Sequence, residues 1–269
     1  MQYTNLHTHT VFSDGTCTPE EMAQAAIEKN MLSLGFSDHS PMDHDLTYCV
    51  KHQALPAYCR EIRRLKEKYK DQIEIALGLE MDSLTSSCVC RADYDYVIGD
   101  CHYVHTSDGP MSIDHCIEGQ LHVLREYFSM DGAAYSKSYF RTYVHDMKKM
   151  KPDILGHFDL TVKFGLIRED DPAFLSAARE ALSAALEITP VIEMNTGAMA
   201  RGLRSVPYPA PYLLDTVRGC GGKFILSSDC HAAENLIFAF DEARQLLIAH
   251  GFDSMIVWKN GALQEVGIC

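Results

Sequence analysis

No stretch of the 269-residue chain is long and apolar enough to suggest a transmembrane helix, which needs about 20 consecutive apolar residues. The N-terminus lacks a basic segment followed by an apolar run, so a secretory signal peptide is not expected. Ten cysteines are present without a CxxC pair. We interpret them as free thiols of a cytoplasmic protein, with no membrane partner.

Positive charge is also scarce. The chain has 24 lysines and arginines against 37 aspartates and glutamates, and its formal net charge is −13. Binding to nucleic acid depends on lysine and arginine, so nucleic acid is not an expected partner. A small anionic substrate would need a local source of positive charge, and bound metal ions can provide it.

Several catalytic motifs are absent. There is no GxxxxGK[ST] phosphate-binding loop and no GxSxG segment to position a nucleophilic serine. Cys116 is followed six residues later by His122, where a cysteine phosphatase needs arginine. The SDGT segment lacks the first aspartate of a DxDxT strand end. Catalysis through a serine, cysteine or aspartate nucleophile is therefore not indicated.

Short β-rich segments alternate with helical segments along the whole chain. Strands are predicted at residues 3–8, 32–37, 73–80, 95–101, 153–158, 190–195 and 223–228, mostly as short apolar runs typical of buried parallel strands. Helices are predicted between them at residues 18–30, 54–70, 171–188 and 234–251. With no linker or repeat, this order predicts one α/β domain over residues 1–269, either a seven-stranded TIM-like barrel or a doubly wound open sheet.

The connection from Tyr103 to Met150 is long for a single loop. Its segments 119–128 and 136–150 are predicted as two helices, whose aromatic residues at helical spacing indicate a core rather than a binding surface. We expect this helical insertion, around residues 103–150, to lie above the rim of the barrel and to cover the pocket in part.

Potential metal ligands follow most of the predicted strands. His7 and His9 lie on one face of the first strand, because side chains alternate with a period of two. The later strands contribute His39, Glu80, His102, His157 and the pair Asp229 and His231, whereas the sixth strand, ending in EMNTG, has no obvious ligand. A barrel brings all these strand ends to one rim, and an open sheet would spread them along an edge. The pattern therefore favours a barrel with a metal site at its C-terminal rim.

Histidine and carboxylate ligands without thiolate suit divalent Zn, Mn, Fe or Co. Asp14 follows His9 by five residues and completes a set of nine candidate ligands. One ion does not need so many protein ligands. We therefore predict two or three divalent ions, with a carboxylate that bridges two of them.

Five segments together, HTHTVFSDG, SDHS, GLE, GHFD and SSDCH, resemble the polymerase and histidinol phosphatase (PHP) family in order and spacing. The resemblance runs from the first to the last predicted strand. The length, the SDHSP segment and the long insertion are similar to the stand-alone histidinol-phosphate phosphatases of that family. The resemblance implies a distorted seven-stranded barrel and a metal-dependent phosphomonoesterase of histidine biosynthesis, which hydrolyses L-histidinol phosphate.

Carried onto this sequence, the resemblance implies three ion sites. They are formed by His7, His9, Glu80 and Asp229; by Glu80, His102 and His157; and by Asp14, His39 and His231. Glu80, Asp229 and His231 are the expected catalytic residues. A histidine at the rim or Asp229 would supply the proton for the leaving alkoxide.

Phosphate contacts are expected from the segment after the sixth strand. Arg201 and Arg204 lie in NTGAMARGLRS, and a planar guanidinium can bind two phosphate oxygens. Lys163 stands in LTVKFG, where many relatives carry arginine, and is a further candidate together with His39.

Two other functions stay open at this point. A PHP-type phosphoesterase for another small phosphoester or a nucleotide would use the same ligands. A non-catalytic metal-binding accessory domain would not need an intact ligand set. The expected partner is a small-molecule phosphomonoester, and the sequence does not indicate the oligomeric state.

Overall fold

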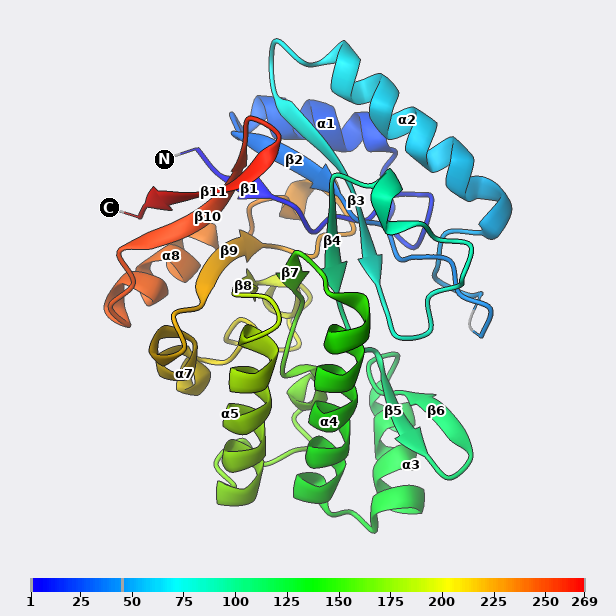
Figure 1. The fold of residues 1–269 in the computed structure, drawn as a ribbon, viewed down its shortest axis with the longest axis vertical. Helices are drawn as coiled ribbons and strands as arrows, with labels where there is room; N and C mark the ends of the chain where they lie inside the picture. The colour runs from blue at the N-terminus through cyan, green and yellow to red at the C-terminus, as the bar shows by residue number, and fades with distance from the viewer. Residues whose placement is uncertain (1, 45, 269) are drawn as a thin grey trace.

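The computed structural model describes residues 2–44 and 46–268, and a nine-stranded sheet runs through it (Figure 1). The strands follow one another in the order β1 (Thr4–Asn5), β2 (Ser33–Phe36), β3 (Glu74–Met81), β4 (Tyr96–Gly99), β7 (Ile154–Leu155), β8 (Val191–Asn195), β9 (Lys223–Ser227), β10 (Ser254–Lys259) and β11 (Ala262–Gly267). Neighbours pair in parallel except β11, which is antiparallel to β10. The first seven confirm the predicted strands. The C-terminal hairpin β10–β11 was missing from the prediction, although SMIVWK is an apolar, partly β-branched run.

The two ends of this sheet approach each other. The backbone N–H of Trp258 on β10 donates to Thr4 Oγ1 at 3.2 Å, and Ser33 Oγ donates to the Trp258 carbonyl at 2.9 Å. A parallel bridge joins Thr8 to Cys230, beyond the ends of β1 and β9. The backbone ladders do not form a closed ring among the described residues. The structure therefore establishes an α/β fold on a mostly parallel, strongly curled sheet.

Helices cover the outside of the sheet, as expected when parallel strands are connected by crossovers (Figure 1). They are α1 (Pro19–Glu28), α2 (Leu55–Lys68), α5 (Pro172–Leu186), the short α7 (Leu214–Gly219) and α8 (Phe240–Ala249). The single-turn α6 (Gly197–Ala200) instead follows β8 at the carboxyl edge of the sheet, next to Asp229. The 3-10 turns are η1 (His52–Ala54), η2 (Arg91–Asp93), η3 (Leu160–Val162), η4 (Pro211–Leu213) and η5 (Ala233–Asn235). The capping box of Thr18 and Glu21 at the start of α1 is confirmed. In the described part of the chain, no helix is both long and apolar enough to span a bilayer.

One helix begins later than its sequence suggested. The prediction placed a helix over residues 234–251, but α8 starts at Phe240. Ala239 has a φ of 54°, a left-handed backbone that an α-helix cannot contain. The apolar residues before it belong to the η5 turn and the segment that follows, so hydrophobic character alone was a poor guide to the helix boundary.

The insertion after β4 contains more than the two predicted helices. Helices α3 (Ile117–Phe128) and α4 (Gly132–Met150) are confirmed, but a hairpin of β5 (Tyr103–Thr106) and β6 (Gly109–Ser112) precedes them. Tyr139, Phe140 and Tyr143 of α4 are fully buried, as their helical spacing predicted, and so is Tyr135, which precedes the predicted segment. Helix α4 packs beside α5, and the hairpin lies next to α3 (Figure 1).

Tyr96 fills the space between the strands around β3. Its ring is fully buried, and its hydroxyl donates to the carbonyl oxygen of Leu6, next to β1. A Cβ added at Gly78 on β3 would lie 2.2 Å from Tyr96 Cζ, closer than any real contact. Gly78 therefore leaves room for the ring that joins the first, third and fourth strands.

Replacing Gly78 by alanine should lower the free energy of unfolding by about 1–3 kcal/mol, because the methyl group overpacks the Tyr96 ring. Urea denaturation followed by circular dichroism measures this change. Gly219→Ala is the matched control, since nothing lies within 4 Å of the added Cβ at that position. Equal stability of the two variants would contradict the role given to Gly78.

Candidate active site

The candidate ligands predicted from the sequence converge at the carboxyl ends of the parallel strands. Seven of the nine line a cavity of about 830 Å³: Asp14, His39, Glu80, His102, His157, Asp229 and His231. The other two, His7 and His9, are fully buried next to them. Side chains from β1 to β9, more than 200 residues apart in the chain, therefore meet in one place.

Glu80 lies at the centre of this cluster. Its Oε1 is 3.5 Å from His7 Nε2, 3.4 Å from His102 Nε2 and 3.3 Å from His157 Nε2. Its Oε2 is 2.6 Å from His39 Nδ1. One carboxylate thus faces imidazoles that come from four different strand ends, which is the arrangement a bridging ligand requires.

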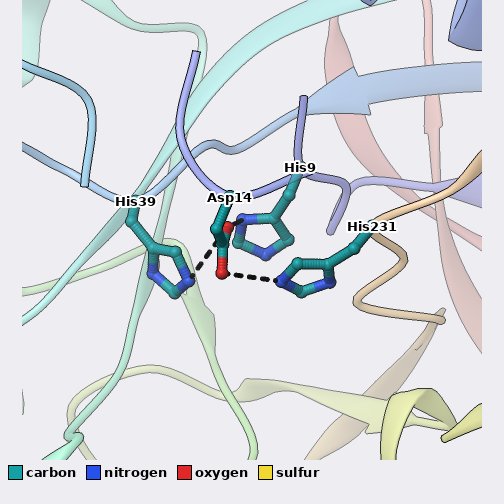
Figure 2. Close-up of side chains that lie close together, drawn as sticks. All are labelled: His9, Asp14, His39 and His231. Atoms are coloured by element: carbon teal, nitrogen blue, oxygen red, sulfur yellow. Dashed lines mark hydrogen bonds and ion pairs between the residues drawn. The ribbon is translucent and has the colours of Figure 1, made fainter. Parts of the chain in front are cut away.

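A second group surrounds Asp14, whose carboxylate lies between three imidazoles (Figure 2). Asp14 Oδ2 is 3.2 Å from His231 Nε2, and Oδ1 is 3.6 Å from His9 Nδ1 and 3.8 Å from His39 Nε2. These four residues each offer a ligand atom within 4.8 Å of the others. The loop that connects His9 to Asp14 is anchored by Asp38, whose Oδ1 accepts from the backbone N–H groups of Thr10 and Ser13.

The structure groups the nine residues somewhat differently from the three sets that the resemblance implied. His9 joins the Asp14 group, and it also lies with His7 and Asp229 in another. His39 joins both the Asp14 group and a group with Glu80 and His102. His9 and His39 therefore connect neighbouring groups, so that the possible ion positions form one continuous site.

Three further carboxylates hold the imidazoles from behind, and the sequence interpretation missed them as part of the site. His7 Nδ1 lies 2.8 Å from Glu193 Oε2, and His102 and His157 each have Nδ1 3.1 Å from an aspartate, Asp82 and Asp100 respectively. The sequence offered one indication for all three, because each is an acidic residue within or directly after an apolar, buried strand. Glu193 belongs to β8, the strand that lacked an obvious ligand.

The donor set fits divalent metal ions. Glu193 and Asp82 accept at Nδ1 of His7 and His102, so each Nδ1 carries a proton and Nε2 is the ring atom that can bind a cation. Buried atoms that face the site have no hydrogen-bond partner, among them His7 Nε2 and both ring nitrogens of His9. Such orphaned atoms are expensive in a protein interior, and coordination of a cation would satisfy them.

Electrostatics in the site agree with this fit. Burial would raise the pKa of Glu80, but the imidazoles of His39 and His7 hold it well below its usual range. Burial, together with His231 and His39, lowers the pKa of His9 to about 3, so that its ring is neutral and able to coordinate. The site thus contains ionised carboxylates and at least one imidazole ready to bind a cation.

Two of the predicted substrate-binding cations face the cavity. Arg201 Nη2 donates to Asp229 Oδ2 at 3.1 Å, and Nη1 lies 3.4 Å from His231 Nδ1. Lys163 Nζ donates to the Asp114 carbonyl oxygen at 2.8 Å and lies 3.3 Å from its carboxylate. Both side chains line the cavity, so that positive charge stands on its wall.

Arg204 lies elsewhere than its sequence position suggested. Its guanidinium pairs with both carboxylate oxygens of Glu169 at 3.0 Å and stacks over the Tyr208 ring. The side chain is only 5% exposed and is not part of the cavity wall. Arg204 is therefore paired with Glu169 behind the cavity, away from the wall that Arg201 and Lys163 line.

A mostly parallel α/β sheet with imidazole and carboxylate ligands at the carboxyl ends of its strands defines a class, the metal-binding α/β proteins. The family model described as the PHP domain matches residues 5–197, and the chain belongs to this family. The resemblance inferred from the motifs is therefore confirmed.

Relatives match over most of the chain. A protein of Deinococcus radiodurans named "probable histidinol-phosphatase" is 31% identical over 250 residues, which cover 88% of this chain and 89% of the relative. The histidinol-phosphatase of Bacillus subtilis is 24% identical and covers 90% of this chain and 98% of its own. The histidinol phosphate phosphatase of Lactococcus lactis, solved with Zn, L-histidinol and phosphate, has a TM-score of 0.70 at 21% identity, with 98% and 99% of the two chains covered. That likeness establishes the fold.

Glu193→Gln should weaken metal binding by about 10- to 100-fold, as is typical when the partner of a ligating histidine is changed. Each Glu193 oxygen accepts from two donors, His157 N–H and Asn195 Nδ2 on one side and His7 Nδ1 and Ser227 Oγ on the other. An amide NH₂ would therefore oppose donors in either orientation. Metal content after dialysis against a weak chelator, measured by elemental analysis, tests this.

Glu265→Gln is the control for that experiment, because Glu265 lies on the C-terminal hairpin and pairs at the surface with Lys223 of β9. Metal content should be unchanged there. A Glu193→Gln protein that is folded and keeps its metal as firmly as this control would refute the role of Glu193.

Proposed function

We propose that this protein is a metal-dependent phosphomonoesterase that hydrolyses L-histidinol phosphate to L-histidinol and phosphate, a step of histidine biosynthesis. The convergence of nine imidazole and carboxylate ligands beside two cavity-facing cations carries this proposal. Membership in the PHP family and the names of its relatives support the choice of substrate.

The finer architecture belongs to the same proposal. We infer one domain over residues 1–269, whose sheet acts as a distorted barrel around the site. The contacts of Trp258 with Thr4 and Ser33, and the bridge from Thr8 to Cys230, support a barrel because they join the two ends of the sheet. Closure at the Thr8–Cys230 bridge, between the segments after β1 and β9, would give a barrel of seven strands, the number expected from the sequence.

Two or three divalent ions, of Zn, Mn, Fe or Co, would be held by His7, His9, Asp14, His39, Glu80, His102, His157, Asp229 and His231. The Lactococcus lactis structure contains Zn, which supports zinc as one candidate. Bound ions would supply Lewis-acid activation of water and would neutralise the charge of the phosphoryl group.

The protein's own groups would orient the substrate. Arg201 would bind phosphoryl oxygens through its planar guanidinium, with Asp229 fixing its position. Lys163 stands on another part of the wall and adds a second positive charge. His231 and Asp229 lie beside Arg201 and are the two candidates for the proton that the leaving alkoxide needs. Burial would raise the pKa of Asp229, but Arg201 and His7 hold it well below its usual range, which favours His231 as the donor.

The insertion offers a complementary wall for the other end of the substrate. Ser112, Asp114, His115 and His122 line the same cavity from this segment. Burial raises the pKa of Asp114, but the nearby charges of Lys163 and His102 outweigh this effect and lower the pKa to about 2. Asp114 is therefore ionised at neutral pH. A carboxylate at this place suits the ammonium or imidazole of histidinol phosphate, and a simple alkyl phosphate has no group to pair with it.

A phosphate-release assay with purified protein tests the function. Histidinol phosphate should be hydrolysed with a kcat/KM at least about 10-fold above that for glycerol phosphate, the discrimination expected from one charged contact. Prolonged treatment with a chelator should abolish the activity, and a divalent metal should restore it. Equal kcat/KM values for both substrates would assign the protein to another small phosphoester, and full activity without metal would refute metal dependence.

Arg201→Ala should reduce kcat/KM for histidinol phosphate by about 10- to 1000-fold, the size of one lost charge-assisted contact. Metal content should not fall, because removing a cation beside Asp229 does not weaken the hold of that carboxylate on metal. Arg168→Ala is the control, since Arg168 is 80% exposed and pairs only with Asp170 in the hydrogen bonds described. If both variants keep the activity of the unchanged protein, Arg201 does not bind the phosphoryl group.

A further inference from the structure

A second group of reactive side chains lies outside the metal-ligand cluster. Cys88 is exposed in the loop after β3, and its Sγ is 3.2 Å from Nδ1 of His52 in η1. His52 Nε2 in turn lies 2.9 Å from Asp43 Oδ1. A thiol, an imidazole and a carboxylate are thus aligned in the order used to activate a nucleophile.

The order of these contacts decides the direction in which the thiol proton moves. An ionised carboxylate only accepts, so the proton of His52 resides on Nε2, next to Asp43. Nδ1 therefore presents its lone pair to the Cys88 thiol and can accept its proton. Asp43 thereby orients the ring so that Nδ1 faces the thiol, and removal of the thiol proton during attack gives the thiolate, which is the reactive form of cysteine.

The two loops that carry this group are tied together. Met42 and Thr85 form an antiparallel bridge, the Ser86 N–H donates to the Pro41 carbonyl at 2.8 Å, and Ser40 Oγ lies 2.6 Å from Thr85 Oγ1. Asp43 follows this junction directly, and Cys88 lies two residues beyond Ser86. The approach of the carboxylate, imidazole and thiol is therefore supported by the backbone.

A cavity of about 420 Å³ adjoins the thiol. Cys88 and Cys90 line it, together with Arg60, Arg63 and the carboxylate of Asp93. Arg60 and Arg63 are both exposed, and a guanidinium binds a carboxylate with two parallel hydrogen bonds. In a chain of net charge −13, two arginines beside this thiol form a local site for an anionic reagent.

We propose that Cys88 is a modification site that undergoes thiol–disulfide exchange with small disulfides that carry carboxylates. The Cys88 thiol gives its proton to His52, and the thiolate attacks one sulfur of the disulfide. A new S–S bond forms to Cys88, the original S–S bond breaks, and the leaving thiolate takes the proton from His52. The products are a mixed disulfide on Cys88 and one free small thiol, so that atoms and electrons balance.

Cys220 provides an internal comparison. It is also exposed, but its Sγ donates to the hydroxyl of Ser183 at 3.5 Å, and a hydroxyl is a poor base for a thiol. The same protein therefore contains an exposed cysteine beside an imidazole and another beside a hydroxyl. Their rates of modification can be measured in one sample.

The test uses the full-length protein with its metal, treated with oxidised glutathione and, separately, with neutral bis(2-hydroxyethyl) disulfide. Timed samples are quenched by alkylation, and mixed disulfides are located by peptide mass spectrometry. Cys88 should react with oxidised glutathione at least about 10-fold faster than Cys220, because His52 Nδ1 is placed to take the thiol proton during the attack. His52→Ala should bring Cys88 to the rate of Cys220, and the Cys220 rate should not change.

The double variant Arg60→Ala/Arg63→Ala tests the choice of reagent. It should slow modification by oxidised glutathione several-fold and leave the rate with bis(2-hydroxyethyl) disulfide unchanged. Modification of Cys88 no faster than that of Cys220, or a Cys88 rate that His52→Ala does not lower, overturns the proposal. If the double arginine variant lowers the rate of Cys88 modification equally for both disulfides, the preference for reagents with carboxylates is overturned. Phosphatase activity is not part of the measurement, so the outcome is independent of the proposed function.

Discussion

Charge compensation in a largely buried site is the constraint on which this structure depends. Six carboxylates lie near imidazoles at one end of the sheet: Glu80, Asp229, Asp14, Glu193, Asp82 and Asp100. Buried ionised groups are costly unless they are paired. Protons on the imidazoles can compensate this charge, and divalent cations can do so while the imidazoles stay neutral. The buried charges that are unfavourable in the metal-free protein therefore suit the binding of metal ions.

The fold brings these groups together through very short strands. Parallel neighbours place their carboxyl ends at one edge, and the curl of the sheet brings the segments after β1 and β9 into contact at Thr8 and Cys230. Tyr96 occupies the interior next to Gly78 and Gly35, where an added Cβ would clash with the tyrosine side chain. Stability and site geometry are therefore linked, because the packing that curls the sheet also sets the distances between the imidazoles.

The walls of the cavity come from different parts of the chain than its floor. Residues at the strand ends form the floor. The walls include Arg201 after β8, Lys163 after β7 and Asp114 from the insertion. Arg201 and Lys163 add positive charge to these walls, and Asp114 adds a carboxylate on the side of the insertion. The loops after β2 and β3 serve both reactive regions of the molecule, since they follow His39 and Glu80 and also carry Asp43 and Cys88.

The sequence alone determined the alternation of strands and helices, the nine candidate ligands and the family, because strand periodicity and residue chemistry are local properties. It did not reveal the hairpins β5–β6 and β10–β11 or the start of α8 at Phe240, since these depend on packing and on the left-handed backbone of Ala239. Arg201 and Arg204 look alike in sequence, yet one faces the cavity and the other pairs with Glu169. Glu193, Asp82 and Asp100 acquire their roles only when distant strands place an imidazole beside each of them, which is a property of the tertiary structure.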